Sequence, residues 1–212
     1  MLHDLITVTS KHMKAAELIY NKVKDLKKKK PIITITGEVG TGKSTLSLVV
    51  ARMLKADGVR VKIIDLDDYY NIPPLERKQW RKTKGLDSIG ADELDWNRLY
   101  QNISDFKADK TSSLPCIDLI TDYLDEVITD FNGVDLLLIN GLYSVKCKEA
   151  DLKVFIELTY QQTTEEQEYG GKEDLDEFRK KVLLREHELV QKSKDEANFY
   201  IDFDASMEIF HL

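Results

Sequence analysis

Gly37-Glu38-Val39-Gly40-Thr41-Gly42-Lys43-Ser44 decides the fold of this chain, and it fits the pattern G-x-x-x-x-G-K-[ST] without a mismatch. Glycines let the backbone curl so that successive N–H groups point at phosphate oxygens. In this pattern the lysine reaches the β and γ phosphates of a nucleotide, and the hydroxyl of Ser44 can bind Mg²⁺. A chance glycine-rich turn is the alternative explanation, and the sequence on either side of the loop argues against it.

The flanking segments predict a strand before the loop and a helix after it. Ile32-Ile33-Thr34-Ile35-Thr36 is a β-branched run typical of a buried strand, and Pro31 ends whatever precedes it. Residues 45–57 carry apolar side chains at helical spacing, and Gly58 suits the C-terminal cap of that helix. A strand, a phosphate-binding loop and a helix in this order predict a nucleotide-binding site.

The rest of the chain alternates between predicted strands and helices. Several of the strands are apolar along their whole length, which favours a parallel sheet covered by helices on both faces. We therefore expect a single α/β domain of the doubly wound type. The pattern predicts helices over residues 11–26, 92–106 and 175–197, strands over 59–66, 134–139 and 151–158, a strand pair or hairpin over 117–128, and an irregular charged segment over 73–90.

Composition and charge exclude several classes of protein. The chain has 212 residues, of which 42% are hydrophobic, and a net charge of −7, which disfavours broad binding to nucleic acid or to an anionic membrane. Two distant cysteines, Cys116 and Cys147, and four histidines give no spacing of a structural zinc site. Without a signal peptide or a bilayer-length apolar run, we expect a cytoplasmic protein with neither a nucleic-acid nor a membrane partner. Self-association is left open.

Carboxylates gather where the second predicted strand ends. Asp65, Asp67 and Asp68 follow an apolar run, and open α/β sheets hold their ligands at the carboxyl ends of their strands. If this strand neighbours the loop, as we expect, a carboxylate there can accept a proton from an attacking hydroxyl or position Mg²⁺. A polar strand end that only caps the next segment is the alternative.

Taken together, these motifs resemble the uridine kinase and phosphoribulokinase family over residues 32 to about 200. Besides the loop and Asp67-Asp68-Tyr69-Tyr70, the segment 90–96 resembles that family's Asp-His-Pro-Asp-Ala-Phe-Asp stretch. Residues 114–119 resemble its Pro-x-Tyr-Asp-Phe strand, 136–143 its strand ending in Glu-Gly, and 151–158 the strand that follows.

The resemblance implies a three-layer P-loop NTPase fold with a small lid over about 160–175, and transfer of the γ-phosphoryl group of ATP to a hydroxyl of a small metabolite, with a nucleoside as one candidate acceptor. It implies Asp67 as the catalytic base together with Lys43, and Mg²⁺ held by Ser44 and Asp65. The expected acceptor-site residues are Asp92, Tyr70, Arg77 and Arg81. The expected ATP-binding residues are Gly37, Glu38, Val39, Gly40, Thr41, Gly42, Lys43, Ser44 and Thr45.

The chain also departs from the family pattern. Asn140 stands where relatives carry Glu, and Ile117 and Asp122 stand where uridine kinases present aromatic and His contacts to the base. The expected lid is acidic over 161–169, with Lys172 as its cation and Arg179 as a candidate replacement for a lid arginine, although Arg179 also suits an i,i+4 ion pair. A nucleotide-binding module with weak or lost transfer activity that acts through a partner is the alternative function.

Two further expectations concern the helices at the ends of the chain. Residues 1–30 hold eight lysines against three acidic residues, and we expect them to form a basic helix packed on or preceding a kinase domain over 31–212. His187 lies in a charged run of the last helix, and we expect it to be exposed to solvent.

Overall fold

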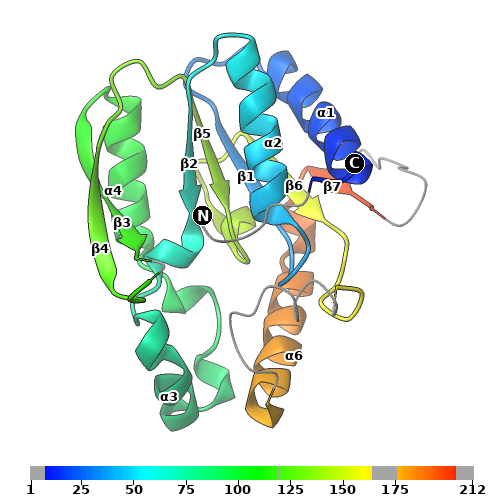
Figure 1. Ribbon diagram of the computed structural model, residues 1–212, viewed down its shortest axis with the longest axis vertical. Helices are drawn as coiled ribbons and strands as arrows, with labels where there is room; N and C mark the ends of the chain where they lie inside the picture. The colour runs from blue at the N-terminus through cyan, green and yellow to red at the C-terminus, as the bar shows by residue number, and fades with distance from the viewer. Residues whose placement is uncertain (1–7, 119, 164–175, 204–212) are drawn as a thin grey trace.

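A computed structural model describes residues 8–118, 120–163 and 176–203. Its centre is a parallel sheet with the strand order β2-β5-β1-β6-β7 (Figure 1). A separate antiparallel hairpin of β3 and β4 lies to one side with α4. The strands are β1 Ile32–Thr36, β2 Val61–Asp65, β3 Thr111–Ile117, β4 Leu124–Asp130, β5 Leu136–Asn140, β6 Leu152–Ile156 and β7 Phe199–Ile201.

Helices cover both faces of the sheet, which confirms the predicted α/β class. Alternate residues of β1 enter different cores: Ile33 and Ile35 pack with α1 and α2, whereas Ile32 packs with α4 on the other face. Each face of the fully buried strands is thereby removed from water, as their continuous apolar sequence predicts. The helices are α1 Ser10–Asp25, α2 Lys43–Ala56, α3 Pro74–Lys84, α4 Trp96–Lys107 and α6 Glu177–Lys192.

The strand order shows how the expected carboxylates lie relative to the loop. The sequence suggested that the strand ending in Asp65 neighbours the loop, and in the structure β5 lies between this strand, β2, and β1, with Ile35 paired to Asn140 and Asn140 paired to Asp65. Sequence periodicity marks a buried strand without showing which strands lie beside it. Asn140 therefore stands between the loop and the carboxylates, at the same edge of the sheet.

Several boundaries also differ from the prediction. Residues 74–84 form α3 rather than an irregular segment, with Pro74 in the first turn and Gly85 at the C-cap. This helix was missed because its sequence is almost wholly polar, so no apolar period marks it. The predicted hairpin is present, but β3 begins at Thr111, and β7 was not predicted at all. The helix predicted over 92–106 begins only at Trp96, and the one over 175–197 spans Glu177–Lys192.

The N-terminal helix packs on the face of the sheet that α2 covers. Ala15, Ala16 and Ile19 of α1 are fully buried in the core that also holds Leu46 and Val50 of α2. Their burial removes apolar surface that a separate helix would expose to water. No helix in the described part of the chain is long and apolar enough to cross a membrane.

We propose that α1 and the sheet unfold as one unit, and Ile19→Ala tests this. Ile19 has no exposed surface, so the truncation leaves a cavity and we expect a loss of about 2–5 kcal/mol in the free energy of unfolding, measured by urea denaturation. Met13→Ala is the control on the same helix, because Met13 is 46% exposed. An unchanged midpoint for Ile19→Ala would show that α1 does not belong to the cooperative unit.

Candidate functional site

The glycine-rich loop joins the end of β1 to the start of α2. Gly40 and Gly42 adopt the left-handed conformation, with φ of 79° and 80°, which a side chain would strain. Gly42 is the N-cap of α2 and brings no side-chain hydrogen bond to its first turn, so the amides of that turn are left for a ligand. Lys43 folds back across the loop, and its Nζ donates to the carbonyl of Glu38 at 2.7 Å. This geometry is that of an anion-binding helix N-terminus.

The carboxylate of Glu38 ties the loop to distant parts of the chain. It is 2% exposed, accepts hydrogen bonds from the backbone N–H of Tyr160 at 2.8 Å and from Nε2 of Gln191 at 2.6 Å, and lies 2.8 Å from Nδ1 of His187. A buried carboxylate needs such partners to offset its lost hydration. The prediction of a solvent-exposed His187 is wrong, because the imidazole lies against Glu38.

The loop is therefore anchored by α6 and by residues 160–163, which are the described start of the expected lid. Thr163 is buried, and its hydroxyl donates to the carbonyl of Val39 at 2.9 Å. The ring of Tyr160 meets that of His187 edge to face. Sequence reasoning missed this anchor because its parts are more than 100 residues apart. The expected lid cation Lys172 lies outside the described residues.

Asp65, the last residue of β2, and Asp67 lie at the edge of the sheet that the loop occupies. Oδ1 of Asp65 accepts a hydrogen bond from the backbone N–H of Asp67 at 3.0 Å, and Asp67 itself is exposed. Burial, together with the nearby charges of Asp67 and Asp68, raises the pKa of Asp65 to about 7, while the hydrogen bond from the backbone N–H of Asp67 and the charge of Lys43 oppose the shift. Asp65 and Lys43 are thus near enough to interact electrostatically, which brings the two predicted motifs into one site.

Asn140 lies between these motifs at the end of β5. It is 1% exposed, and its Nδ2 has no hydrogen-bond partner among the described residues. An uncharged amide is a weaker ligand for Mg²⁺ than a carboxylate. Asn140 therefore offers the site an N–H donor where relatives are expected to carry a negative charge.

A second cluster brings the predicted acceptor residues together. The segments 69–71 and 93–95 lie side by side, because Asp95 N–H donates to Tyr69 O and Asn71 N–H donates to Glu93 O, both at 2.8 Å. Tyr70 is buried, and the guanidinium of Arg77 lies 3.7 Å from the centre of its ring. Asp92 is exposed in the same turn as Glu93.

The hairpin borders this cluster. The backbone N–H of Ile117, at the end of β3, donates to Oδ1 of Asp68 at 3.0 Å. Asp122 adopts a left-handed conformation in the turn after β3, with φ of 56°. The β3 end of the hairpin is thus joined to the aspartates that follow β2.

Arg81 is not a solvated loop arginine. It is 5% exposed and makes two parallel hydrogen bonds to Glu93, from Nε at 2.7 Å and from Nη2 at 2.9 Å. Its Nη1 donates to Glu186 of α6 at 3.1 Å, and Nη1 of Arg179 lies 3.5 Å from the same carboxylate. These pairs join α3, the acceptor segment and α6. The i,i+4 pair considered for Arg179 is not the one that forms, since its partner Glu186 is seven residues away.

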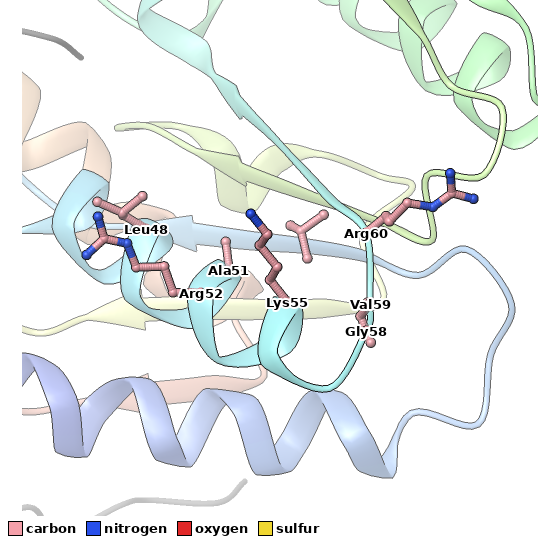
Figure 2. Close-up of a pocket in the computed structure, with 8 residues that line it drawn as sticks. Leu48, Ala51, Arg52, Lys55, Gly58, Val59 and Arg60 are labelled. Atoms are coloured by element: carbon pink, nitrogen blue, oxygen red, sulfur yellow. The ribbon is translucent and has the colours of Figure 1, made fainter.

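A hollow of about 600 Å³ lies elsewhere, between the C-terminal half of α2 and the start of β2. Its basic side chains Arg52, Lys55 and Arg60 point in different directions (Figure 2), so they do not converge on one ligand. Among the described residues, no group of three or more His, Cys, Asp or Glu side chains is placed to hold a metal ion.

Comparison with known proteins gives a consistent result. A model described as the Phosphoribulokinase / Uridine kinase family matches residues 32–162. A uridine kinase of Ureaplasma parvum is 28% identical over 134 residues, which cover 61% of this chain and 63% of the relative. The match thus spans less than two thirds of that relative's length.

Solved structures share the fold at lower identity. Phosphoribulokinase from Rhodobacter spheroides has a TM-score of 0.60 and 15% identity, over 82% of this chain and 70% of that one. D-glycerate 3-kinase from Cryptococcus neoformans has a TM-score of 0.60 and 16% identity, over 93% and 97% of the two chains. These matches support the predicted P-loop fold.

The pKa of Asp65 predicts how stability depends on pH. A pKa near 7 in the folded state, above the ordinary value of 3.8, means that the folded protein binds the proton more tightly than the unfolded chain does. The free energy of unfolding should therefore fall as pH rises from about 4 to about 7, and Asp65→Asn should remove that part of the slope. Urea denaturation across this range measures it. Parallel pH profiles for the two proteins would contradict the shift.

Glu38→Gln tests the anchor of the loop. The amide of Gln has an NH₂ donor in place of one carboxylate oxygen, and this donor would face the N–H donors that now bind Glu38. We therefore expect the free energy of unfolding to fall by about 1–3 kcal/mol in thermal or urea unfolding. The exposed Glu76 provides the control Glu76→Gln, which should leave stability unchanged. Equal stability of both variants and the unmodified protein would show that the buried carboxylate does not anchor the loop.

Proposed function

The chain belongs to the phosphoribulokinase and uridine kinase family, and from that premise we propose that it transfers the γ-phosphoryl group of ATP to a hydroxyl of a small metabolite. One observation carries the proposal: the phosphate loop with Lys43 and the carboxylates Asp65 and Asp67 occupy the same edge of the sheet, within electrostatic reach of one another. Phosphoryl transfer requires such a combination of a phosphate cradle and a carboxylate.

The residues at the loop have separate roles in this proposal. The amides at the start of α2 and the ammonium group of Lys43 hold the phosphates of ATP by charge and by hydrogen bonds. Asp67 is exposed and therefore accessible to an acceptor, whose hydroxyl proton it accepts as the oxygen attacks the γ-phosphorus. The bond from the γ-phosphorus to the bridging oxygen breaks, and ADP leaves.

Mg²⁺ fits the donor set of the site. Ser44 offers a hydroxyl and Asp65 a carboxylate, and Mg²⁺ in phosphate-transfer sites is usually bound by one or two carboxylates together with substrate phosphates. When bound, the ion neutralises charge on the phosphates. The raised pKa of Asp65 favours the protonated form in its absence, so a nearby cation would shift this group toward the carboxylate.

The acceptor site is proposed around Tyr70, Arg77 and Asp92. The Nη2 of Arg77 is buried without a hydrogen-bond partner among the described residues, and a hydroxyl or other oxygen of an acceptor would satisfy it. Arg81 contributes to this site indirectly, through its hydrogen bond to Glu93. The relatives described above carry the names of kinases for different acceptor molecules. We therefore propose that a nucleoside is the first acceptor to test, followed by sugars and hydroxy acids.

Two features favour a second function. Asn140 brings an amide to the edge where a carboxylate is expected to assist Mg²⁺, and the stretch that contains the expected lid is rich in glutamate. Both features would weaken phosphoryl transfer while leaving the phosphate loop intact. A nucleotide-binding protein with weak or lost transfer activity, acting through a partner, is therefore the alternative. Cytoplasmic location and the absence of nucleic-acid and membrane partners stay predictions.

The test is an acceptor panel read by ADP release, with nucleotide binding measured in parallel. For the kinase, we expect acceptor-dependent turnover that Asp67→Asn lowers by about 10²–10⁴-fold without a comparable loss of ATP affinity. Lys43→Ala should weaken ATP binding itself, and Asp87→Asn, an exposed aspartate outside the proposed site, is the control. Tight ATP binding with no turnover on any acceptor would favour the alternative.

A further inference from the structure

The start of α1 lies beside the phosphate loop. This helix precedes the residues that the family model matches, which begin at 32. It runs alongside α2 (Figure 1), and the small side chains of Ala15 and Ala16 at the contact are fully buried. The close packing of the two helices brings His12, in the first turn of α1, to Gly42 at the N-cap of α2.

The hydrogen bonds of His12 fix its neutral tautomer. Thr9 caps α1, and its backbone N–H donates to Nδ1 of His12 at 3.3 Å, while its hydroxyl lies 2.8 Å from the same atom. Nδ1 is thus an acceptor, so the proton of the neutral ring resides on Nε2. Burial lowers the pKa of His12, which favours this neutral form.

Nε2 of His12 lies against the phosphate loop at Gly42. A Cβ placed on Gly42 would lie only 2.7 Å from Nε2, so the imidazole rests directly against that glycine. Phe203, which follows β7, supports the ring from another side, with the ring centres 5.5 Å apart. Within residues 8–118, 120–163 and 176–203, Nε2 has no hydrogen-bond acceptor.

We propose that His12 is a nucleotide-binding residue, whose Nε2–H donates to an oxygen of the bound polyphosphate. Gly42 immediately precedes Lys43 and the first turn of α2, where phosphate binds in the function proposed above, and the inference rests on that function. Thr9 holds the neutral imidazole through Nδ1. Nε2–H therefore donates to an anionic oxygen without first breaking another hydrogen bond. The nucleotide site then includes α1, which precedes the residues that the family model matches.

Two substitutions separate the two nitrogens of the imidazole. His12→Asn keeps an acceptor near the position of Nδ1, so it preserves the cap of α1, but it is too short to place a donor at Nε2. His12→Gln is long enough to place an amide N–H near Nε2. Lys14→Gln, on an exposed position of the same helix, controls for the loss of a polar group on α1.

The experiment measures dissociation constants of the full chain for Mg-ATP and Mg-GTP by calorimetry, with thermal unfolding of each variant as a check on folding. Because the proposed hydrogen bond is to a charged oxygen, we expect His12→Asn to weaken the binding of both nucleotides alike, by about tenfold or more. His12→Gln should retain most of the affinity, and Lys14→Gln all of it.

The outcomes distinguish this inference from the proposed function. Unchanged affinity of His12→Asn, in a chain that binds ATP, would overturn the inference alone. Weaker binding of only one of the two nucleotides would also overturn it, because it would point to the base rather than the polyphosphate. Absence of nucleotide binding by the unmodified chain would overturn both, whereas binding without turnover on any acceptor would contradict only the kinase.

Discussion

The site depends on the parallel arrangement of the central sheet. Parallel strands place all their carboxyl ends at one edge, so the loop after β1, the aspartates after β2 and Asn140 at the end of β5 meet there although they are far apart in sequence. The arrangement requires both faces of the sheet to be buried, which the two separate hydrophobic cores provide. The chemistry of the edge thus follows from the packing of apolar side chains that take no part in it.

Buried charges hold the surrounding segments in place. Glu38 binds the loop to His187 and Gln191 of α6 and to the backbone N–H of Tyr160, and Arg81 joins Glu93 to Glu186 of the same helix. Burying these groups costs free energy that only well-aligned partners offset, so such clusters fix geometry more than they add stability. Both clusters converge on α6, which makes this helix a common support for the phosphate end and the acceptor end of the proposed site.

The N-terminal helix precedes the residues that the family model matches, which begin at 32, and it packs on α2. Its apolar face is part of the main core, and its first turn reaches Gly42 through His12. The proposed role of His12 would extend the phosphate-binding region beyond the residues that the family model matches.

The sequence by itself determined the features that depend on neighbouring residues: the phosphate loop, the strand and helix around it, and the buried character of β1, β5 and β6. Glycine spacing and apolar runs are local properties, so they can be seen in the sequence before the chain is folded. Only the tertiary structure decided that β5 separates β1 from β2, that the carboxylate of Glu38 turns to His187 rather than to solvent, and that Arg81 is buried. The partner of such a charged side chain is a group that is distant in the sequence and that the fold places beside it. Its burial and its role follow from those distant contacts, because the free energy of a buried charge depends on the groups around it and not on its own type.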